Sequence, residues 1–446
     1  MKEKNGKSLT VLYFRVGTAF FTRGGVSNQE DIMTKLVGNA VVGQSGGPTA
    51  AINATLAGVI RGALLESGED GAIRTIYGMR NGIDGLLDEN LVELNKIFDA
   101  EENIKTLEHT PSSALGSCRR KLPKFAENKD IYFKILDIFK KYDIRYFFYI
   151  GGNDSMDTVA KLSAFMKEQS YEMRVVGVPK TIDNDLCVTD HAPGFGSAAK
   201  FIATTVQEII RDCAVYRIPA VTIVEVMGRD AGWLAASAGV GEFVGLPSPD
   251  LVYLPERVFD IESFFSDVEA ALAKHPNVVV CVSEGIRYAD GTYVGETKGR
   301  AVDQFGHAAS LSGAGKALEM AVKEKFGCKV RSIELSLTQR CAAHIASAED
   351  IRESVEIGQA AVKAAVYEGV TGEIIIYNRL SSSPYTYNIS HIDIALVANN
   401  VKDVCDEFIN EKSNGITAAC AEYILPLIEG EAYPEYKNGL PVFFTI

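Results

Sequence analysis

Residues 145–167 read RYFFYIGGNDSMDTVAKLSAFMK: an apolar run, a glycine pair and a helical pattern in direct succession. The run 145–150 is rich in Phe, Tyr and Ile without polar alternation, which is typical of a strand buried on both faces. In 154–167, apolar residues recur at three-residue steps, which predicts a helix with Asp154 or Ser155 as its N-cap. A buried strand followed at once by a helix is the unit from which α/β folds are built.

Similar apolar runs precede other glycine-rich or polar loops. They are 38–42 before GQSGGP, 174–178 before PKTIDND, 220–226 before MGRD, and 277–282 before SEG. Helical patterns follow at 197–211 and 263–274. This alternation predicts a doubly wound α/β fold with mainly parallel sheets. Such folds bind ligands beyond the carboxyl ends of their strands, where these loops lie.

Length and charge limit the remaining possibilities. The chain has 446 residues, whereas one hydrophobic core stops growing at about 250–300 residues, so two domains are expected. The net charge of −13 argues against nucleic acid as a partner. No apolar run approaches the ~20 residues that span a bilayer, so no membrane partner is expected. Eight dispersed cysteines without a CxxC pair fit a reducing, cytoplasmic setting.

The N-terminal segment differs from the rest. Residues 11–21 resemble the apolar part of a signal peptide, but Arg15 interrupts them and no small-residue cleavage site follows. At Met33 the sequence reads like a fresh start, with a short polar lead before a strand. We therefore expect residues 1–36 to be an extension outside the core.

Two loops have the features of phosphate sites. In GQSGGPTAAIN, residues 43–53, and in IGGNDSMD, residues 150–157, a buried strand meets a glycine pair at a helix start. Glycines let backbone N–H groups approach an anion, and the helix N-terminus adds partial positive charge. Neither loop is a Walker A motif. The alternative is a tight turn or a capped helix, but two such loops together suggest a polyphosphate, or a phosphate with Mg²⁺.

The loop PKTIDND, residues 179–185, adds charged groups. Lys180 could hold a phosphate as a point charge. Asp183 and Asp185 lie two residues apart, and in extended backbone both would face one way, one to accept a proton and one to hold Mg²⁺. A surface turn with solvated acids is the alternative. Other basic residues are scattered through an acidic chain, and each alone is as readily a surface charge: Arg119, Arg120, Lys121, Arg229, Arg331 and Arg340.

Taken together, these motifs resemble the phosphofructokinase family. GGP, GGNDS, PKTIDND, MGRDAGWLAA, SEG and the late QR follow in the family's order and spacing, from about residue 37 to at least residue 345. The resemblance implies two Rossmann-like domains with the active site in the cleft between them. It implies a donor domain of residues 37–185, completed by 341–400, and a fructose 6-phosphate domain of residues 186–340, completed by part of 401–446. It also implies phosphoryl transfer to the 1-hydroxyl of fructose 6-phosphate, with Mg²⁺, by a homodimer or homotetramer with a shared active site.

The resemblance is closer to the diphosphate-dependent branch than to the ATP-dependent one. ATP-using members typically carry GGDGS and a small residue before TIDND, whereas this chain has GGNDS and Lys180. Asp154 stands where a glycine would border the nucleotide α-phosphate, and a carboxylate there would repel that group. Lys180 adds a positive charge that suits a compact diphosphate. The branch implies a reversible reaction of glycolysis and gluconeogenesis.

The family's functional residues transfer position by position. Asp183 matches the general base, and Arg119 and Lys180 match the groups that neutralise the transferring phosphate. The resemblance assigns diphosphate binding to Gly47, Asn153, Asp154 and Lys180, and metal binding to Asp185 and Asn153. It assigns the sugar-phosphate site to Thr181, Asp183, Met227, Gly228, Arg229, Glu284, Arg331 and Arg340, with Arg331 donated by a neighbouring subunit.

Three positions depart from the family pattern. Asn153 replaces the usual aspartate, which removes one carboxylate from the metal region. Leu337 stands where a histidine or tyrosine often contacts the sugar phosphate, and Ala220 where ATP-using tetramers supply another arginine. Two alternatives therefore stay open: an ATP-dependent 6-phosphofructokinase, and a regulatory subunit without catalysis. The intact Asp183, Asp185 and Arg119 argue against the second.

Overall fold

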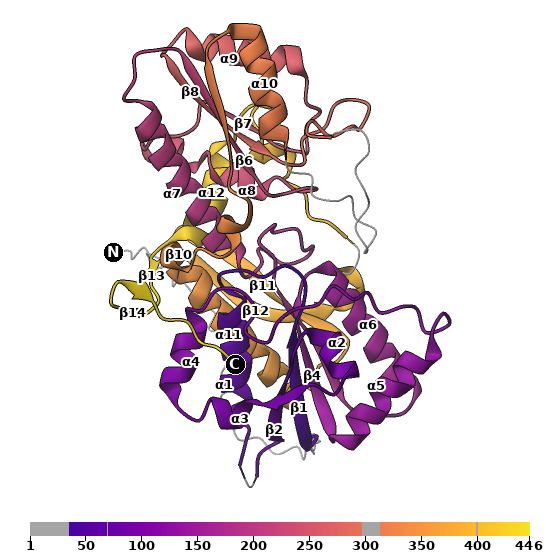
Figure 1. The fold of residues 1–446 in the computed structure, drawn as a ribbon. Coiled ribbons are helices and arrows are strands. Elements are labelled where there is room, and N and C mark those ends of the chain that lie inside the picture. Colours follow the sequence, from indigo (N-terminus) through magenta and orange to yellow (C-terminus); the bar gives the residue numbers. More distant parts are fainter. Residues whose placement is uncertain (1–34, 69, 297–312, 398–399) are drawn as a thin grey trace, which may run out of the picture. The chain divides into compact units, whose positions relative to one another are not determined.

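The computed structural model describes residues 35–68, 70–296, 313–397 and 400–446 (Figure 1). Of the expected N-terminal extension, residues 1–34 lie outside the described part of the chain. Within it, Lys35 forms an ion pair with Glu66 (3.1 Å), and Leu36 packs against a core of buried side chains. In the described residues, no helix combines the length and apolar character that a membrane span requires.

The larger sheet contains seven strands in the order β12-β11-β5-β4-β1-β2-β3. Its central strands run parallel, while β3 and β12 pair antiparallel at the two edges. The strands are β1 (Gly38–Gln44), β2 (Ile73–Met79), β3 (Leu91–Glu93), β4 (Ile144–Gly151), β5 (Arg174–Pro179), β11 (Glu373–Ser382) and β12 (Tyr385–Asp393). The predicted strands at 38–42, 145–150 and 174–178 are thus confirmed as β1, β4 and β5.

The smaller sheet contains four parallel strands in the order β7-β8-β6-β9. They are β6 (Ala220–Val226), β7 (Leu251–Tyr253), β8 (Asn277–Ser283) and β9 (Lys329–Glu334). The predictions at 220–226 and 277–282 are confirmed as β6 and β8. Short pairs elsewhere complete the strands: β10 (Ala346–Ser347) with β13 (Glu431–Ala432), and β14 (Tyr436–Lys437) with β15 (Leu440–Pro441).

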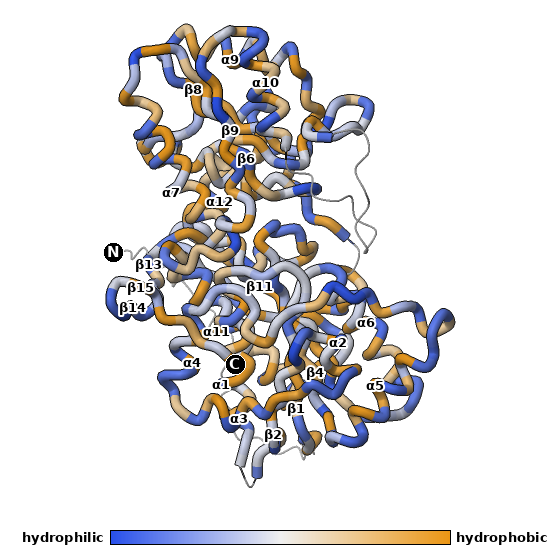
Figure 2. Tube along the Cα trace, viewed as in Figure 1, coloured by the Kyte–Doolittle hydropathy of each residue, from blue (hydrophilic) through white to orange (hydrophobic). Residues whose placement is uncertain are grey.

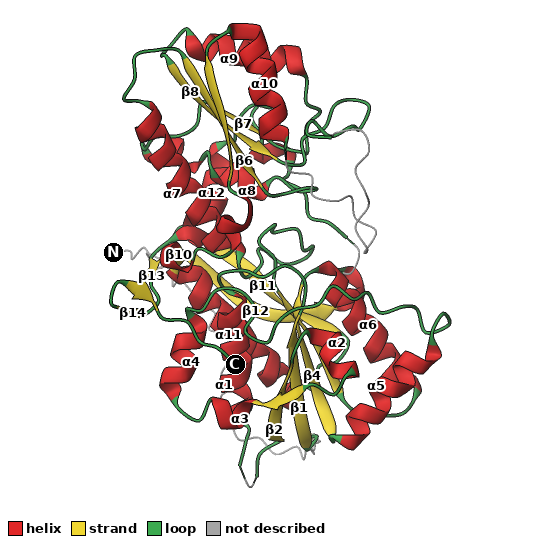
Figure 3. Cartoon of the chain, in the orientation of Figure 1, coloured by secondary structure: helices red, strands yellow, loops and turns green. Residues whose placement is uncertain are grey.

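Helices cover both faces of each sheet, as a doubly wound fold requires (Figure 3). On β1, Ala40 and Val42 join one core and Val41 joins the core on the opposite face. On β6, Val224 and Ile223 divide in the same way. Figure 2 shows the resulting hydrophobic colouring along the strands. The α-helices are α1 (Ile52–Leu65), α2 (Gly82–Leu87), α3 (Leu94–Ile97), α4 (Glu101–Glu108), α5 (Lys129–Lys141), α6 (Asn153–Glu168), α7 (Phe195–Cys213), α8 (Trp233–Ser237), α9 (Ile261–Leu272), α10 (Ala314–Phe326), α11 (Ala348–Lys363) and α12 (Ala418–Ile424).

The helix predictions are confirmed in position but wrong in one cap. The patterns at 154–167, 197–211 and 263–274 correspond to α6, α7 and α9. The N-cap of α6 is Gly152, without a side-chain cap, and neither Asp154 nor Ser155. The glycine pair lets the chain turn from β4 directly into the helix, so the helix begins earlier than the side chains suggest. Asp154 then lies in the first turn, where the helix dipole favours a carboxylate.

Residues after 340 return to the larger sheet and its helices. Strand β11 joins the sheet beside β5, and α11 packs along α1. At this helix crossing, an ideal Cβ on Gly58 would lie 2.1 Å from the carbonyl oxygen of Val355. A Cβ on Gly358 would lie 2.3 Å from the carbonyl oxygen of Thr55. The two glycines therefore let the backbones of α1 and α11 touch.

This contact reverses the usual effect of a glycine-to-alanine change in a helix. Alanine normally stabilises a helix interior by roughly 0.5–1 kcal/mol. We expect Gly58→Ala to destabilise the protein instead, by roughly 1–3 kcal/mol, because a backbone carbonyl blocks the new methyl group. Gly62→Ala is the matched control on the same helix, since its Cβ would meet side-chain atoms of Val362 at 3.0 Å but no backbone atom nearer than 3.5 Å, so we expect a smaller loss. Urea unfolding measures both, and a Gly58→Ala protein as stable as Gly62→Ala would contradict the helix contact.

Candidate active site

One cavity of about 550 Å³ collects the loops that follow five strands. It opens at the carboxyl ends of β1, β4 and β5 in the larger sheet and of β6 and β8 in the smaller sheet. It is lined by Ser45, Gly46, Gly47, Pro48, Thr49, Cys118, Arg119, Arg120, Gly152, Asn153, Asp154, Ser155, Lys180, Thr181, Ile182, Asp183, Asp185, Met227, Arg229, Asp230, Glu284 and Arg340. Of the predicted site residues, only Gly228 and Arg331 are missing from this lining.

Lys180 joins two of these loops. Its Nζ donates a hydrogen bond to the carbonyl oxygen of Gly47 (2.7 Å), and its backbone N–H donates to Gly151 (3.0 Å). The side chain is only 3% exposed, and burial lowers the pKa of Lys180 to about 8. A Cβ on Gly46, whose φ is +78°, would lie 3.2 Å from this ammonium. The glycine loop therefore brings its backbone close to a desolvated positive charge.

Two guanidinium groups share the cavity with Lys180. A Cβ on Gly47 would lie 3.4 Å from Nη1 of Arg340, so Arg340 lies beside the glycine loop. Burial first, and then the nearby Arg119, lower the pKa of Arg340. The sequence assigned Arg340 to the sugar phosphate, and its position here also brings it close to the donor loop. Three cations at one point suit a ligand with several negative charges.

The carboxylates lie on the same loop as Lys180. The backbone N–H of Asp183 donates to Oγ1 of Thr181 (3.1 Å). Burial, followed by the charges of Asp185 and Glu284, raises the pKa of Asp183 well above its ordinary value. Burial also raises the pKa of Asp185. A carboxyl group with a raised pKa in a cavity is suited to accept a proton near neutral pH.

The expected geometry of this loop was wrong in one respect. Asp183 and Asp185 both line the cavity, but the backbone between them is not extended. Asn184 has a φ of +52° and is fully buried. The carboxylates therefore share the cavity because of a left-handed turn, and not because of strand alternation.

Asn153 tests whether a hard cation fits this site. Its Oδ1 is buried and has no hydrogen-bond partner among the described residues. An unpartnered amide oxygen in the cavity that the Asp185 carboxylate also lines is the oxygen chemistry that Mg²⁺ takes. In the described part of the chain no group of three His, Cys, Asp or Glu residues could hold a metal. Mg²⁺ often keeps only one or two protein ligands and completes its shell with water and substrate phosphate, so the residues present fit it.

The smaller sheet supplies the opposite wall. The backbone N–H of Met227 donates to Oε1 of Gln339 (3.2 Å), and Oγ of Ser283 donates to the carbonyl of Gly228 (2.5 Å). Gly228 has a φ of +125° and shapes the turn that presents Met227 and Arg229 without lining the cavity itself. Burial raises the pKa of Glu284.

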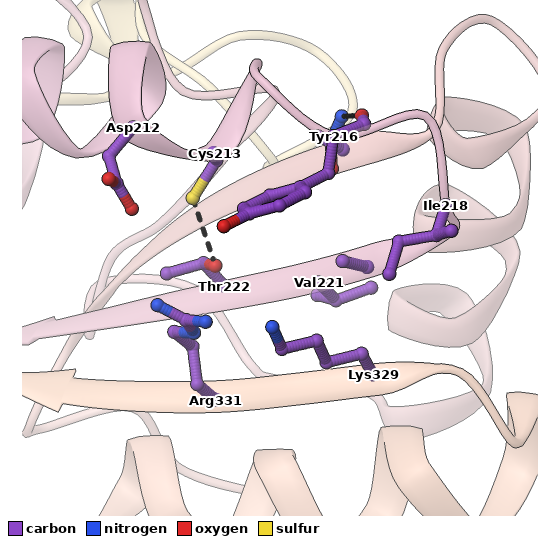
Figure 4. Close-up of a pocket in the computed structure, with 10 residues that line it drawn as sticks. Asp212, Cys213, Tyr216, Ile218, Val221, Thr222, Lys329 and Arg331 are labelled. Carbon is purple, nitrogen blue, oxygen red and sulfur yellow. Dashed lines mark hydrogen bonds between the residues drawn. The ribbon is translucent and has the colours of Figure 1, made fainter.

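Arg331 lies elsewhere. It projects from β9 into a separate pocket at the edge of the smaller sheet, with Lys329, Cys213 and Thr222 around it (Figure 4). Ala220, the other departure from the family's interface pattern, lines the same pocket. The third departure, Leu337, is 55% exposed. Within one chain, the structure does not bring Arg331 to the cavity, so its role stays a prediction about a second copy.

Sequence reasoning missed several lining residues. Asp230 and Ser45 lie inside the motifs MGRD and GQSGGP, so their neighbours gave a signal for them. Asp230 accepts a hydrogen bond from Nη2 of Arg287 (2.6 Å), and nothing in the local sequence pointed to Arg287 as its partner. Lys121, outside the lining, pairs with Asp154 at 3.1 Å. Such long-range partners cannot be read from spacing.

A buried charged network lies behind the cavity. Nδ1 of His191 contacts Asp190 (2.9 Å), and its Nε2 contacts Glu353 (2.6 Å). The imidazole stacks on Tyr377, with ring centroids 4.5 Å apart. Although burial opposes the charge, the two carboxylates raise the pKa of His191 to about 9. His191 is therefore a structural residue, a charged link between the loop after Asp185 and α11.

Comparisons with known proteins agree with this geometry. A family model described as Phosphofructokinase matches residues 39–365. The pyrophosphate--fructose 6-phosphate 1-phosphotransferase of Methylococcus capsulatus is 42% identical, over 92% of this chain and 96% of that protein. Two crystal structures titled pyrophosphate-dependent phosphofructokinase are also similar. The one from Nitrosospira multiformis has a TM-score of 0.82 at 39% identity, covering 91% of this chain and 95% of that one. The one from Marinobacter aquaeolei has a TM-score of 0.80 at 36% identity, covering 92% and 96%.

The His191 network predicts a pH dependence of stability. An unfolded histidine loses its proton near pH 6.5, whereas folded His191 keeps it to about pH 9. The raised pKa therefore stabilises the fold fully below pH 6.5, and this contribution, up to about 3 kcal/mol, is lost as the pH rises to 9. We expect the stability difference between wild type and His191→Asn to shrink over that range in urea unfolding. The same change at the partly exposed His275 is the control, and a difference that stays constant with pH would contradict the assignment.

Proposed function

The chain belongs to the phosphofructokinase family, and we propose that it transfers a phosphoryl group from diphosphate to the 1-hydroxyl of fructose 6-phosphate. The products are fructose 1,6-bisphosphate and phosphate. One observation carries this proposal: a single cavity joins a buried ammonium on a glycine loop to a carboxyl group of raised pKa. The names of the relatives agree with it.

The donor side favours diphosphate over a nucleotide. Lys180 supplies a compact charge next to the glycine loop, where a small anion can reach it. Asp154 stands where ATP-using members of the family have a glycine. Its carboxylate, half exposed and paired with Lys121, adds bulk and negative charge where an α-phosphate would have to lie.

The reaction is an in-line attack. Asp183 takes the proton of the 1-hydroxyl as that oxygen attacks a phosphorus of diphosphate. Lys180, Arg119 and Arg340 offset the charge that develops on the leaving phosphate. Phosphoryl transfer depends chiefly on positioning and electrostatics, so these groups suffice for the protein's part. The anhydride that breaks and the ester that forms have similar energies, so the reaction is reversible near neutral pH.

Asp185 and Asn153 would hold Mg²⁺ in this site. When bound, the ion neutralises charge on the diphosphate oxygens and on the leaving phosphate. Asn153 in place of the usual aspartate would offer a neutral oxygen ligand, so the protein would offset less of the ion's charge. This weaker protein set still leaves Asp185 as a charged ligand.

The acceptor side includes a second copy of the chain. Thr181, Met227, Arg229 and Glu284 hold the sugar phosphate from within one chain. Arg331 extends this site in the neighbouring copy, since it projects away from its own cavity on an edge strand. The proposal therefore includes a homodimer or homotetramer with a shared active site, in the cytoplasm.

The proposal is tested by turnover of fructose 6-phosphate with Mg²⁺, comparing diphosphate with ATP as donor. We expect turnover with diphosphate and little or none with ATP, measured by the appearance of fructose 1,6-bisphosphate. Turnover with ATP alone would keep the family and overturn the donor argument. Inactivity with both donors, together with retained binding of fructose 6-phosphate, would point to a non-catalytic subunit.

The role of Asp183 as the general base is tested by the substitution Asp183→Asn. An amide cannot take the hydroxyl proton, so we expect kcat to fall about 10²–10⁴-fold while the KM for fructose 6-phosphate changes little. Asp157→Asn is the matched control, because Asp157 pairs with Lys161 on α6 outside the cavity lining. If Asp183→Asn kept more than about a tenth of wild-type kcat, another group would have to be the base.

A further inference from the structure

The loop that carries Asp183 and Asp185 is strained. Asn184 and Val188 have φ values of +52° and +65°, in the left-handed region. That region is costly for a β-branched residue such as Val188. Such a loop keeps its shape only when surrounding groups hold it. The groups that hold this loop are Lys402 and several other residues.

The ammonium of Lys402 bonds three polar atoms of this loop. Its Nζ donates to Oδ1 of Asn184 (3.1 Å) and to the carbonyl oxygens of Thr189 (3.3 Å) and Asp190 (2.7 Å). An ammonium has three donors, and all three are used within seven residues of one loop. Asn184 lies 218 residues earlier in the chain. This ammonium is therefore a long-range clamp on the catalytic loop.

The backbone of Lys402 is fixed as well. Its N–H donates to the carbonyl of Asp185 (2.9 Å), and Val401 forms an antiparallel bridge with Leu186. On its other side, the carbonyl of Lys402 accepts from Nε1 of Trp233 (2.9 Å). Trp233 begins α8, directly after the MGRD turn that borders the cavity. Lys402 thus connects the carboxylate loop to the wall formed by the smaller sheet.

Other groups also hold the loop, among them Tyr377, whose N–H donates to Oγ1 of Thr189 (3.1 Å). Tyr423 accepts from Nδ2 of Asn184 (2.8 Å) and donates to the carbonyl of Asp190 (2.5 Å). Oδ1 of Asn184 also accepts from the N–H of Ala192 (3.1 Å). Among the described residues, however, only Lys402 bonds the carbonyl of Thr189. A neutral side chain at 402 would leave that buried oxygen unpaired and the turn free to relax.

We propose that Lys402 is a positioning residue. Its hydrogen bonds to the carbonyls of Thr189 and Asp190 and to the side-chain amide of Asn184 hold Asp183 and Asp185 in the geometry for phosphoryl transfer. The proposal rests on the proposed function. Lys402 is absent from the cavity lining, so it acts through the loop and not on the substrates. Displacing reacting groups by about 1 Å can cost on the order of 10²-fold in rate. The loss therefore belongs in kcat, while the sugar-phosphate groups of the opposite wall keep KM.

The test compares Lys402→Met with Lys402→Arg in the full-length protein. We expect Lys402→Met to lower kcat about 10²-fold, with the KM for fructose 6-phosphate within about threefold of wild type. Lys402→Arg keeps a cation and should recover part of the loss. Hydrogen exchange at the amides of residues 184–192 should speed up in Lys402→Met, because the N–H of Ala192 depends on Asn184.

Lys200→Met is the matched control. Lys200 is another buried lysine, whose Nζ binds the carbonyl of Gly430 and pairs with Glu431, and these partners lie outside residues 184–192. We expect this variant to lose stability in urea but to keep kcat. If Lys402→Met lowers kcat no more than Lys200→Met, or leaves exchange at 184–192 unchanged, the positioning role is refuted. If wild type turns over neither donor, the proposed function fails, and the exchange experiment still decides whether Lys402 holds the loop.

Discussion

Each buried charge in this protein needs hydrogen-bonding or charged partners, because moving an isolated ion out of water costs several kcal/mol of free energy. Two buried carboxylates are matched by backbone N–H groups. Asp350 accepts from the backbone N–H groups of Gly194 and Ser197 at the start of α7. Glu225 does the same for Gly313 and Gly315 at the start of α10. Residues far apart in sequence are joined through these carboxylates, so the ends of the helices are fixed by tertiary contacts.

The active-site groups are matched less fully than Asp350 and Glu225. Asp183 is buried near two other carboxylates, and its pKa rises for that reason. Among the described residues, Nζ of Lys180 bonds only a carbonyl oxygen, and burial lowers the pKa of this ammonium. Oδ1 of Asn153 has no partner among the described residues. These groups keep unused capacity for a proton, an anion or a cation, which substrates and Mg²⁺ would fill.

Residues from the late part of the chain hold these active-site groups in place. Strand β11 and helix α11 return to the larger sheet, and Lys402 returns to the loop behind Asp183. The close contact at Gly58 and Gly358 brings α11 against α1, near enough for Glu353 to reach His191. A strained loop can therefore persist at the active site because groups from residues 350–425 support it.

The strands and loops that depend on neighbours along the chain could be predicted from the sequence. Strands β1, β4, β5, β6 and β8 were found because burial on both faces leaves unbroken apolar runs. The loops after them were found because a glycine pair or a TIDND motif follows each strand directly, and most predicted site residues line one cavity as a result. Four features became visible only in the folded structure. They are the Gly152 cap, the left-handed turn at Asn184, the hydrogen bonds of Lys402 to the catalytic loop and the separate pocket of Arg331. These features depend on contacts between residues far apart in the chain, and such contacts leave no periodic pattern in the sequence.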